Sequence, residues 1–280
     1  MLGYSLFKNL YQEDNLQVCG TVRSLQNIEG FYSEEEKRAI FLFNALDKKE
    51  HLDRLLKKIK PDYVLNCIGA ISQKDLDQKI LMGLNASFPH ILSKACDQEG
   101  VKLIHFSTDC VFNGSKGNYS ETDIPNASDT YGKSKFLGEV SNNDHLTIRT
   151  SIVGHELLTD LSLVDWFLSQ DKSIKGYSNA IFSGLPCCYI AEILIKYIFN
   201  RNVKGLLHLS AKPISKFDLL KKVSLFYGKK ILIEEESSYY SNKSLNSRKF
   251  SELTGYKPLE WDILINMMYK DFCKFYNRKE

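Results

Sequence analysis

The chain has 280 residues, of which 43% are hydrophobic and 25% are charged, and its formal net charge at pH 7 is +3. These values are typical of a soluble globular protein with a large core, built as one large domain or as a domain with a smaller lobe. The positive charges are interspersed with acidic residues, so a nucleic-acid-binding surface is not expected.

The cysteines and the apolar segments exclude further classes of protein. The seven cysteines lack the spacing of zinc ligands, and Cys187 and Cys188 are adjacent without accompanying histidine pairs. We therefore expect reduced cysteines, no metal site and a cytoplasmic protein. No apolar run approaches 18 residues, and residues 1–4 are not a basic leader before an apolar core. Neither a membrane span nor a signal peptide is expected.

The first half of the chain alternates between predicted helices and strands. Apolar residues at helical spacing predict helices within residues 5–11, 50–60 and 76–95. Short apolar runs predict strands over residues 17–23, 39–44, 63–67, 102–106 and 146–150. This alternation is typical of βαβ units, and it predicts an α/β fold with a doubly wound parallel sheet covered on both faces.

The second half has looser spacing. It contains helical patterns at residues 166–168, 190–199, 213–227 and 259–276 and a strand pattern at residues 206–209. Ser215 is expected to cap the third of these helices.

Ligands of such sheets bind at the carboxyl ends of the strands. The residues predicted at those ends are Arg23, Asn44, Gly69, Thr108 and Ser151. A ligand site is therefore expected along this edge of the sheet.

Residues 103–140 carry the candidate chemistry. An apolar strand ends at Thr108 and Asp109, and a helical segment further along carries Tyr131 and Lys135. A phenol has a pKa of about 10, and a nearby ammonium favours its ionised form. Positions i and i+4 share a helix face, so Lys135 can stand beside Tyr131. With Thr108 holding a carbonyl oxygen, Tyr131 could supply a proton while a nicotinamide delivers hydride.

The Tyr-x-x-x-Lys spacing is weak evidence by itself, because most such pairs lie on helix surfaces. It occurs three times, as Tyr4/Lys8, Tyr131/Lys135 and Tyr239/Lys243. Only the middle pair follows a strand that ends in a hydroxyl and a carboxylate. We therefore assign that pair to catalysis.

Several runs of sequence together resemble a known family. They are residues 61–69, 107–114, 131–139, 149–154 and 245–250. The chain is similar to the extended short-chain dehydrogenase/reductases, and within them to the dTDP-4-dehydrorhamnose reductase branch. The resemblance implies a Rossmann-type NADP-binding domain over residues 1–151, to which about residues 187–211 return. It also implies that residues 152–280 form mainly a substrate-binding lobe.

The resemblance implies roles for individual residues. Thr108, Tyr131 and Lys135 would form the catalytic trio. The substrate-binding residues would be Thr108, Asp109, Ile152 and Phe182. The cofactor-binding residues would be Gly3, Arg23, Asn44, Cys67, Ile68, Gly69, Tyr131, Lys135 and Ser151. An arginine at the position of Arg23 favours the 2′-phosphate, so NADPH is expected in preference to NADH.

The chain departs from the family pattern in two places. Ile152 replaces the tryptophan of rhamnose-type enzymes, which favours a relative that acts on another 4-keto-6-deoxy sugar. The family begins with a strand and a Gly-x-x-Gly-x-x-Gly loop, of which Gly3 would be the last glycine. About ten residues would be absent, and we expect a chain that starts at Met1 to be poorly stable and to bind NADP weakly. A misplaced start site is the favoured explanation.

The resemblance implies NADPH-dependent reduction of a nucleotide-linked 4-keto-6-deoxyhexose, used to make surface polysaccharide. The expected partner is the nucleotide sugar, with no nucleic acid and no membrane, and a homodimer is left open. Alternatives are a nucleotide-sugar epimerase, a 4,6-dehydratase or a non-catalytic subunit such as the regulatory partner of methionine adenosyltransferase. Dehydratases carry an Asp-Glu pair after the threonine, whereas here Asp109 precedes Cys110. The complete trio of Thr108, Tyr131 and Lys135 weighs against a non-catalytic subunit.

Overall fold

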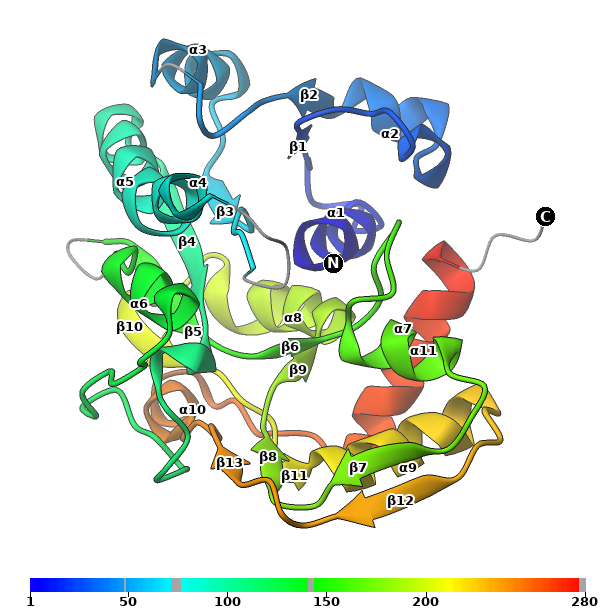
Figure 1. The fold of residues 1–280 in the computed structure, drawn as a ribbon. Helices are drawn as coiled ribbons and strands as arrows, with labels where there is room; N and C mark the ends of the chain where they lie inside the picture. Colours follow the sequence, from blue (N-terminus) through cyan, green and yellow to red (C-terminus); the bar gives the residue numbers. More distant parts are fainter. Residues whose placement is uncertain (48, 72–76, 141–143, 277–280) are drawn as a thin grey trace.

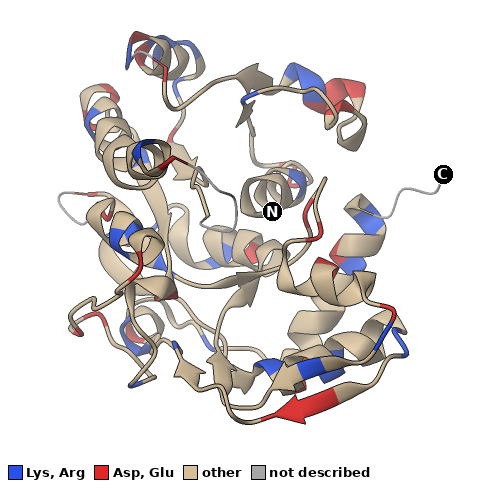
Figure 2. Ribbon diagram, viewed as in Figure 1, with Lys and Arg blue, Asp and Glu red and all other residues tan. Residues whose placement is uncertain are grey.

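The computed structural model describes residues 1–47, 49–71, 77–140 and 144–276. Helices and parallel strands alternate over the first half of the chain, and the second half mainly builds a second group of short strands and helices (Figure 1). Lys, Arg, Asp and Glu are interspersed over most of the ribbon (Figure 2). None of the described helices is long and apolar enough to cross a membrane.

Four parallel strands form the main sheet. In spatial order they are β10 (Gly205–His208), β5 (Leu146–Arg149), β4 (Lys102–Ser107) and β3 (Tyr63–Asn66). All of β5 and all but the first residue of β4 are buried, as expected for parallel strands covered on both faces. Each predicted strand in this sheet is confirmed to within one residue at either end, and the predicted α/β class is confirmed.

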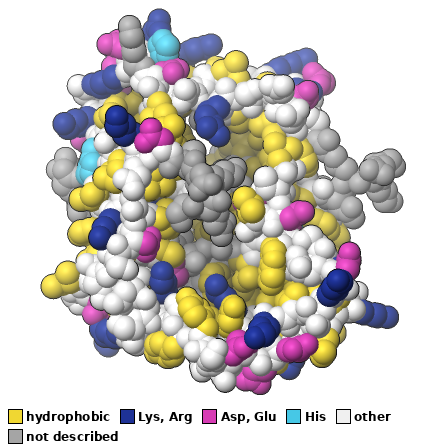
Figure 3. All heavy atoms as spheres, in the orientation of Figure 1, with side chains coloured by type: hydrophobic (Ala, Val, Ile, Leu, Met, Phe, Trp, Pro, Cys, Tyr) yellow, Lys and Arg dark blue, Asp and Glu magenta, His cyan; other side chains and the backbone are white. Residues whose placement is uncertain are grey.

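Two more strands, β1 (Gly20–Val22) and β2 (Ile40–Leu42), form a separate parallel pair. Among the described residues, β1 pairs only with β2 and β3 pairs only with β4, so each sheet keeps an open edge. Both strands are shorter than predicted, because a two-stranded sheet buries little; Leu42 is 69% exposed. Figure 3 shows hydrophobic side chains in a recess on the face of the molecule that is turned toward the viewer in Figure 1.

Helix α1 (Leu2–Leu10) packs against α8 (Cys187–Ile193), and no strand precedes it in the described residues. Leu2, Leu6 and Leu10 repeat every four residues, so they lie on one face of the helix. They are buried in the main core together with Ile190 of α8. The α8 helix continues into the π-turn η4 (Leu194–Ile198), which confirms the helix predicted at residues 190–199.

Further helices cover the sheet at the side of β3 and β4. They are α3 (Lys49–Ile59), α4 (Gln78–Met82), the π-turn η2 (Gly83–Ser87), α5 (Phe88–Glu99) and α6 (Thr130–Leu137). Leu52 and Leu56 of α3 share a buried cluster with Phe88 and Leu92 of α5. Gly100 ends α5 with a left-handed backbone, at φ 68°, which glycine adopts without strain. The predicted helices at 50–60 and 76–95 are confirmed where residues are described.

After residue 160 the described chain also forms short strands and further helices outside the main sheet. The strands are β7 (Ile174–Tyr177), β8 (Ala180–Phe182), β11 (Ile214–Ser215), β12 (Ile233–Glu236) and β13 (Ser241–Asn242). The helices are α7 (Leu163–Ser169), α9 (Lys216–Tyr227), α10 (Arg248–Thr254) and α11 (Trp261–Phe275). Ser215 caps α9 as predicted, since its hydroxyl accepts a hydrogen bond from the Asp218 amide at 2.9 Å. These strands are too short for their alternation to be recognised in the sequence.

The remaining elements are short connections. They are η1 (Glu29–Phe31), α2 (Glu34–Arg38), η3 (Asp109–Val111), β6 (Ile152–Val153) and β9 (Leu185–Pro186). The pairing of β6 with β9 joins the segment that follows β5 to the segment that precedes α8.

Candidate active site

Thr108 lies at the carboxyl end of β4 and is buried. Its backbone is extended, and it caps the η3 turn: the hydroxyl accepts a hydrogen bond from the Cys110 amide at 3.1 Å. The same hydroxyl donates to Oδ1 of Asp109 at 3.2 Å. The turn therefore fixes the side chains of both predicted substrate residues at the edge of the sheet.

Helix α6 carries Tyr131 and Lys135, and its first turn is held against η3. Asp129 caps the helix by accepting a hydrogen bond from the Gly132 amide at 2.8 Å. A Cβ on Gly132 would lie 2.2 Å from the backbone oxygen of Cys110, so only glycine permits this approach. The close approach brings the start of α6 beside the residues that follow Thr108.

Lys135 is buried, and its ammonium donates a hydrogen bond to the backbone oxygen of Phe106 at 2.8 Å. Burial lowers the pKa of Lys135 to about 8, while interactions with Glu139 and Cys67 oppose that change. The lysine thus connects α6 to β4, one turn of helix away from Tyr131.

The pKa of Tyr131 is raised, mainly by burial, and an interaction with the side chain of Thr108 opposes the rise. The net lowering of this pKa that was predicted from the neighbouring Lys135 is therefore not seen in this structure. Two physical reasons account for the difference: burial penalises the phenolate, and the Lys135 ammonium is engaged by the Phe106 carbonyl. A phenol that stays protonated is the form that can donate a proton.

Asp109 is buried, and burial raises the pKa of its carboxyl. The Lys243 charge and hydrogen bonds from the side chains of Thr108, Cys110 and Ser151 oppose that rise. Ser151, predicted to bind cofactor, thus lies beside the candidate substrate carboxylate.

A second group of predicted residues gathers near Lys135. A Cβ on Gly3, at the start of α1, would lie 3.3 Å from the Cβ of Cys67. A Cβ on Gly69 would lie 3.9 Å from Nζ of Lys135 and 3.5 Å from Oδ1 of Asn85. The structure therefore brings the start of α1, the end of β3 and the catalytic helix together, with Ile68 in the same segment.

Arg23 and Asn44 follow β1 and β2 on the separate pair of strands. Arg23 is exposed and has no ion pair within the described part of the chain. Asn44 accepts a hydrogen bond from the Leu46 amide at 3.1 Å, which forms a turn after β2. Their location at strand ends agrees with the predicted cofactor edge, and their roles remain predictions.

The two other predicted substrate residues lie on the short strands β6 and β8. Ile152 begins β6, and Phe182 ends β8, where its ring lies 5.9 Å from that of Trp261. A Cβ on Gly184 would be 2.4 Å from both the Phe182 ring and the Ser151 oxygen. Phe182 is 9% exposed, so it contributes mainly to packing in this structure.

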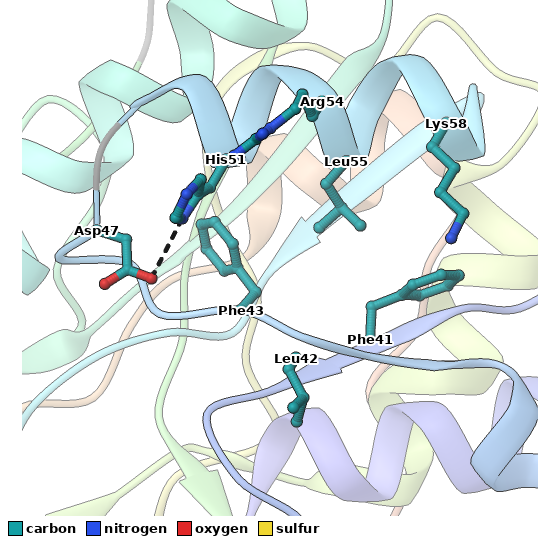
Figure 4. Close-up of a pocket in the computed structure, with 8 residues that line it drawn as sticks. All are labelled: Phe41, Leu42, Phe43, Asp47, His51, Arg54, Leu55 and Lys58. Atoms are coloured by element: carbon teal, nitrogen blue, oxygen red, sulfur yellow. Dashed lines mark ion pairs between the residues drawn. The ribbon is translucent and has the colours of Figure 1, made fainter.

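A shallow pocket lies elsewhere, between β2 and α3 (Figure 4). The aromatic rings of Phe41 and Phe43 point toward α3, and Lys58 lies 5.0 Å from the centre of the Phe41 ring. His51 and Asp47 form an ion pair at 3.5 Å on its rim. None of the residues in the Thr108, Tyr131 and Lys135 trio lines this pocket.

Three neighbours of the site were not given roles from the sequence. Asn85 bonds to the backbone of Ala70 at 2.8 and 2.9 Å and to Ser134 at 3.0 Å, which joins the β3 loop to α6. Glu139 and Lys243 add charge near Lys135 and Asp109. The only feature of the sequence that could have pointed to Asn85 is that it is a polar residue within an apolar helical run.

A parallel α/β sheet with Thr108, Tyr131 and Lys135 gathered at one strand end is the arrangement of the short-chain dehydrogenase/reductase class of NAD(P)-dependent oxidoreductases. A family model described as "RmlD substrate binding domain" matches residues 1–272. The dTDP-4-dehydrorhamnose reductase of Salmonella typhimurium is 32% identical over 243 residues, which cover 76% of this chain and 80% of that protein. The chain belongs to the RmlD substrate binding domain family.

Other comparisons agree with this assignment. The spore coat polysaccharide biosynthesis protein SpsK of Bacillus subtilis is 29% identical over 222 residues, which cover 72% of this chain and 76% of that protein. The dTDP-4-dehydrorhamnose reductase of Bacillus anthracis, solved in complex with NADP, has the same fold. Its TM-score is 0.73 at 20% identity, with 90% of this chain and 98% of that chain covered.

Proposed function

We propose that this chain reduces the 4-keto group of a nucleotide-linked 4-keto-6-deoxyhexose with NADPH, in the synthesis of activated deoxysugars for surface polysaccharide. The convergence of Thr108, Tyr131 and Lys135 at the end of β4 carries the proposal. Membership of a family whose relatives are named dTDP-4-dehydrorhamnose reductases supports the substrate class.

Each residue of the catalytic trio has its own role in the proton transfer. Tyr131 is protonated and donates its proton to the substrate oxygen. Thr108, held by the η3 turn, hydrogen-bonds the same oxygen. The ammonium of Lys135 stabilises the negative charge that develops on the Tyr131 oxygen. When bound, NADPH supplies the hydride that reduces the carbonyl carbon.

Residues along the sheet edge fit a dinucleotide. The start of α1 meets Cys67 at Gly3, and the N-terminus of a helix favours a diphosphate. Gly69 leaves space beside Lys135, and the exposed Arg23 offers a cation for a 2′-phosphate. Cys67, Ile68, Asn44 and Ser151 would complete the cofactor site.

We propose that Asp109, Ile152 and Phe182 contact the sugar, and that Asp109 does so with Ser151 beside it. The same proposal places the NADP-binding domain at residues 1–151 with residues 187–211, where β10 pairs with β5. The proposal includes a cytoplasmic location and allows a homodimer, which analytical ultracentrifugation would test.

The decisive assay mixes the protein with NADPH and either a dTDP- or a UDP-linked 4-keto-6-deoxy sugar. Substrate-dependent loss of NADPH absorbance, with a 4-hydroxy sugar as product, supports the proposal. Absence of turnover with both substrates, in a protein that is folded and binds NADPH, would reject it.

The activity should depend on pH through Lys135. Because its pKa is about 8, the ammonium is present below that pH and is lost as the pH rises through it. We expect kcat to fall above pH 8. In Lys135→Arg the guanidinium stays charged, so whatever activity remains should lack this alkaline decline. An identical decline in Lys135→Arg would assign it to another group.

Replacing Arg23 with glutamine should weaken NADPH selectively. A charge-assisted bond to phosphate is worth about 1.5–3 kcal/mol, so KM for NADPH should rise by roughly tenfold or more. KM for NADH should stay within about twofold, since NADH lacks the 2′-phosphate. The matched control is Arg201→Gln, whose arginine bonds the Thr254 carbonyl at 3.4 Å. Equal effects on both cofactors would contradict the role.

A further inference from the structure

Glu139 follows the end of α6, four residues after Lys135, yet its side chain is only 6% exposed. A carboxylate this deeply buried is costly unless it is paired and hydrogen-bonded. The groups that satisfy it therefore indicate what it holds in place.

Arg149 and Ser107 satisfy both oxygens of Glu139. Nε of Arg149 donates to Oε1 at 2.7 Å, and Nη2 donates to Oε2 at 2.7 Å. The Ser107 hydroxyl donates to Oε1 at 2.6 Å. Ser107 and Arg149 are directly paired across β4 and β5. Glu139 thus clamps the last residue pair of these strands, immediately before Thr108.

The far side of Arg149 is also packed. Its guanidinium lies 5.3 Å from the centre of the Phe112 ring, and Nη1 lies 3.3 Å from Nε2 of His208. Burial and the neighbouring Arg149 lower the pKa of His208 to about 3, so this imidazole stays neutral. Glu139 is therefore the anion that compensates Arg149.

The clamp is coupled to Lys135 in two ways. Lys135 bonds the Phe106 carbonyl, one residue before Ser107, so the clamp also sets the acceptor of its ammonium. The Glu139 charge also favours the charged lysine against the effect of burial. Lys135 also interacts with Cys67, which directly follows β3, and with His105 of β4. Burial holds the pKa of His105 well below its usual value, so this imidazole is neutral. Tyr131 is the titratable neighbour on its own helix.

We infer that Glu139 is a positioning residue for the proposed reduction: it clamps the ends of β4 and β5 beside Thr108 and so fixes the Phe106 carbonyl that accepts the hydrogen bond of Lys135. This inference rests on the proposed function. If Glu139 only stabilised the fold, it would hold the same strands without changing the protonation of Lys135. That difference can be measured.

The first variant is Glu139→Gln, which keeps the shape and removes the charge. Without the carboxylate, Lys135 should lose its proton at lower pH, and the alkaline decline of kcat should move down by about one pH unit. The control is Glu252→Gln, which breaks an exposed pair with Arg248 at 2.7 Å. The control should reproduce the wild-type pH profile.

Because Glu139→Gln leaves a buried guanidinium without its partner, the double variant Glu139→Gln/Arg149→Met provides a neutral replacement of the pair. The protonation of Lys135 is read directly from its rate of acetylation by acetic anhydride across pH, measured by mass spectrometry. A lower midpoint for Lys135 in the folded variants supports the inference. An unchanged midpoint, with kcat lowered equally at every pH, overturns it. This readout needs no turnover, so it remains decisive if the proposed substrate is wrong.

Discussion

Replacing Tyr131 with phenylalanine should reduce NADPH-dependent turnover by roughly 10²- to 10⁴-fold, the usual contribution of a positioned proton donor. The ring remains, so packing around α6 should be preserved. The hydroxyl, whose raised pKa keeps it protonated, is the group that is removed. Steady-state kinetics with the 4-keto sugar measure the loss, and titration of NADPH fluorescence checks that the cofactor still binds.

Tyr239→Phe is the matched control for this experiment, because Tyr239 belongs to another Tyr-x-x-x-Lys pair but is 52% exposed. Its kcat should stay within about twofold of the wild-type value, since surface changes away from special features have small effects. Wild-type turnover in Tyr131→Phe would remove this tyrosine from the mechanism and leave another group as the proton donor.

Replacing Gly132 with alanine should damage both stability and activity. The added methyl group would lie 2.2 Å from the Cys110 oxygen and 2.5 Å from the Cβ of Ala127, so the start of α6 must move. Overpacking of this kind typically costs about 1–3 kcal/mol, and for a chain of this size each kcal/mol lowers Tm by about 2–4 °C. The shift also displaces Tyr131, and a displacement of about 1 Å can cost roughly 10²-fold in rate.

The neighbouring substitution Lys133→Ala controls for the change of helix composition, because Lys133 is exposed on the same helix. It should melt within about 2 °C of wild type and keep its kcat. Differential scanning calorimetry and the NADPH assay measure both quantities. Equal melting temperatures and rates for Gly132→Ala and wild type would show that α6 does not need its close approach to η3.

Local sequence patterns were sufficient to predict the main sheet. Strands β4 and β5 are largely apolar and almost wholly buried, as expected for parallel strands covered on both faces, whereas β3 and β10 at the edges of the sheet are partly buried. The separate pair β1 and β2 was predicted too long, since the extent of a strand depends on its partners. The short strands between residues 174 and 242 leave too few residues for a recognisable period.

The candidate site was predictable for the same reason. Thr108 and Asp109 directly follow an apolar strand. The four-residue spacing places Tyr131 and Lys135 on the same face of a helix, wherever that helix packs. The direction of the change in the Tyr131 pKa was not predictable, because it depends on how deeply the ring is buried. Nor could spacing show that the Lys135 ammonium bonds the Phe106 carbonyl.

By itself the sequence determined the fold class, the family resemblance and the catalytic candidates, because strand periodicity and helical spacing are properties of neighbouring residues. Only the tertiary structure decided how those residues are held and charged. Glu139 and Arg149 are ten residues apart and meet through the pairing of β4 with β5. Burial and buried ion pairs arise from contacts between distant segments, and they set the protonation of Tyr131, Lys135 and Asp109.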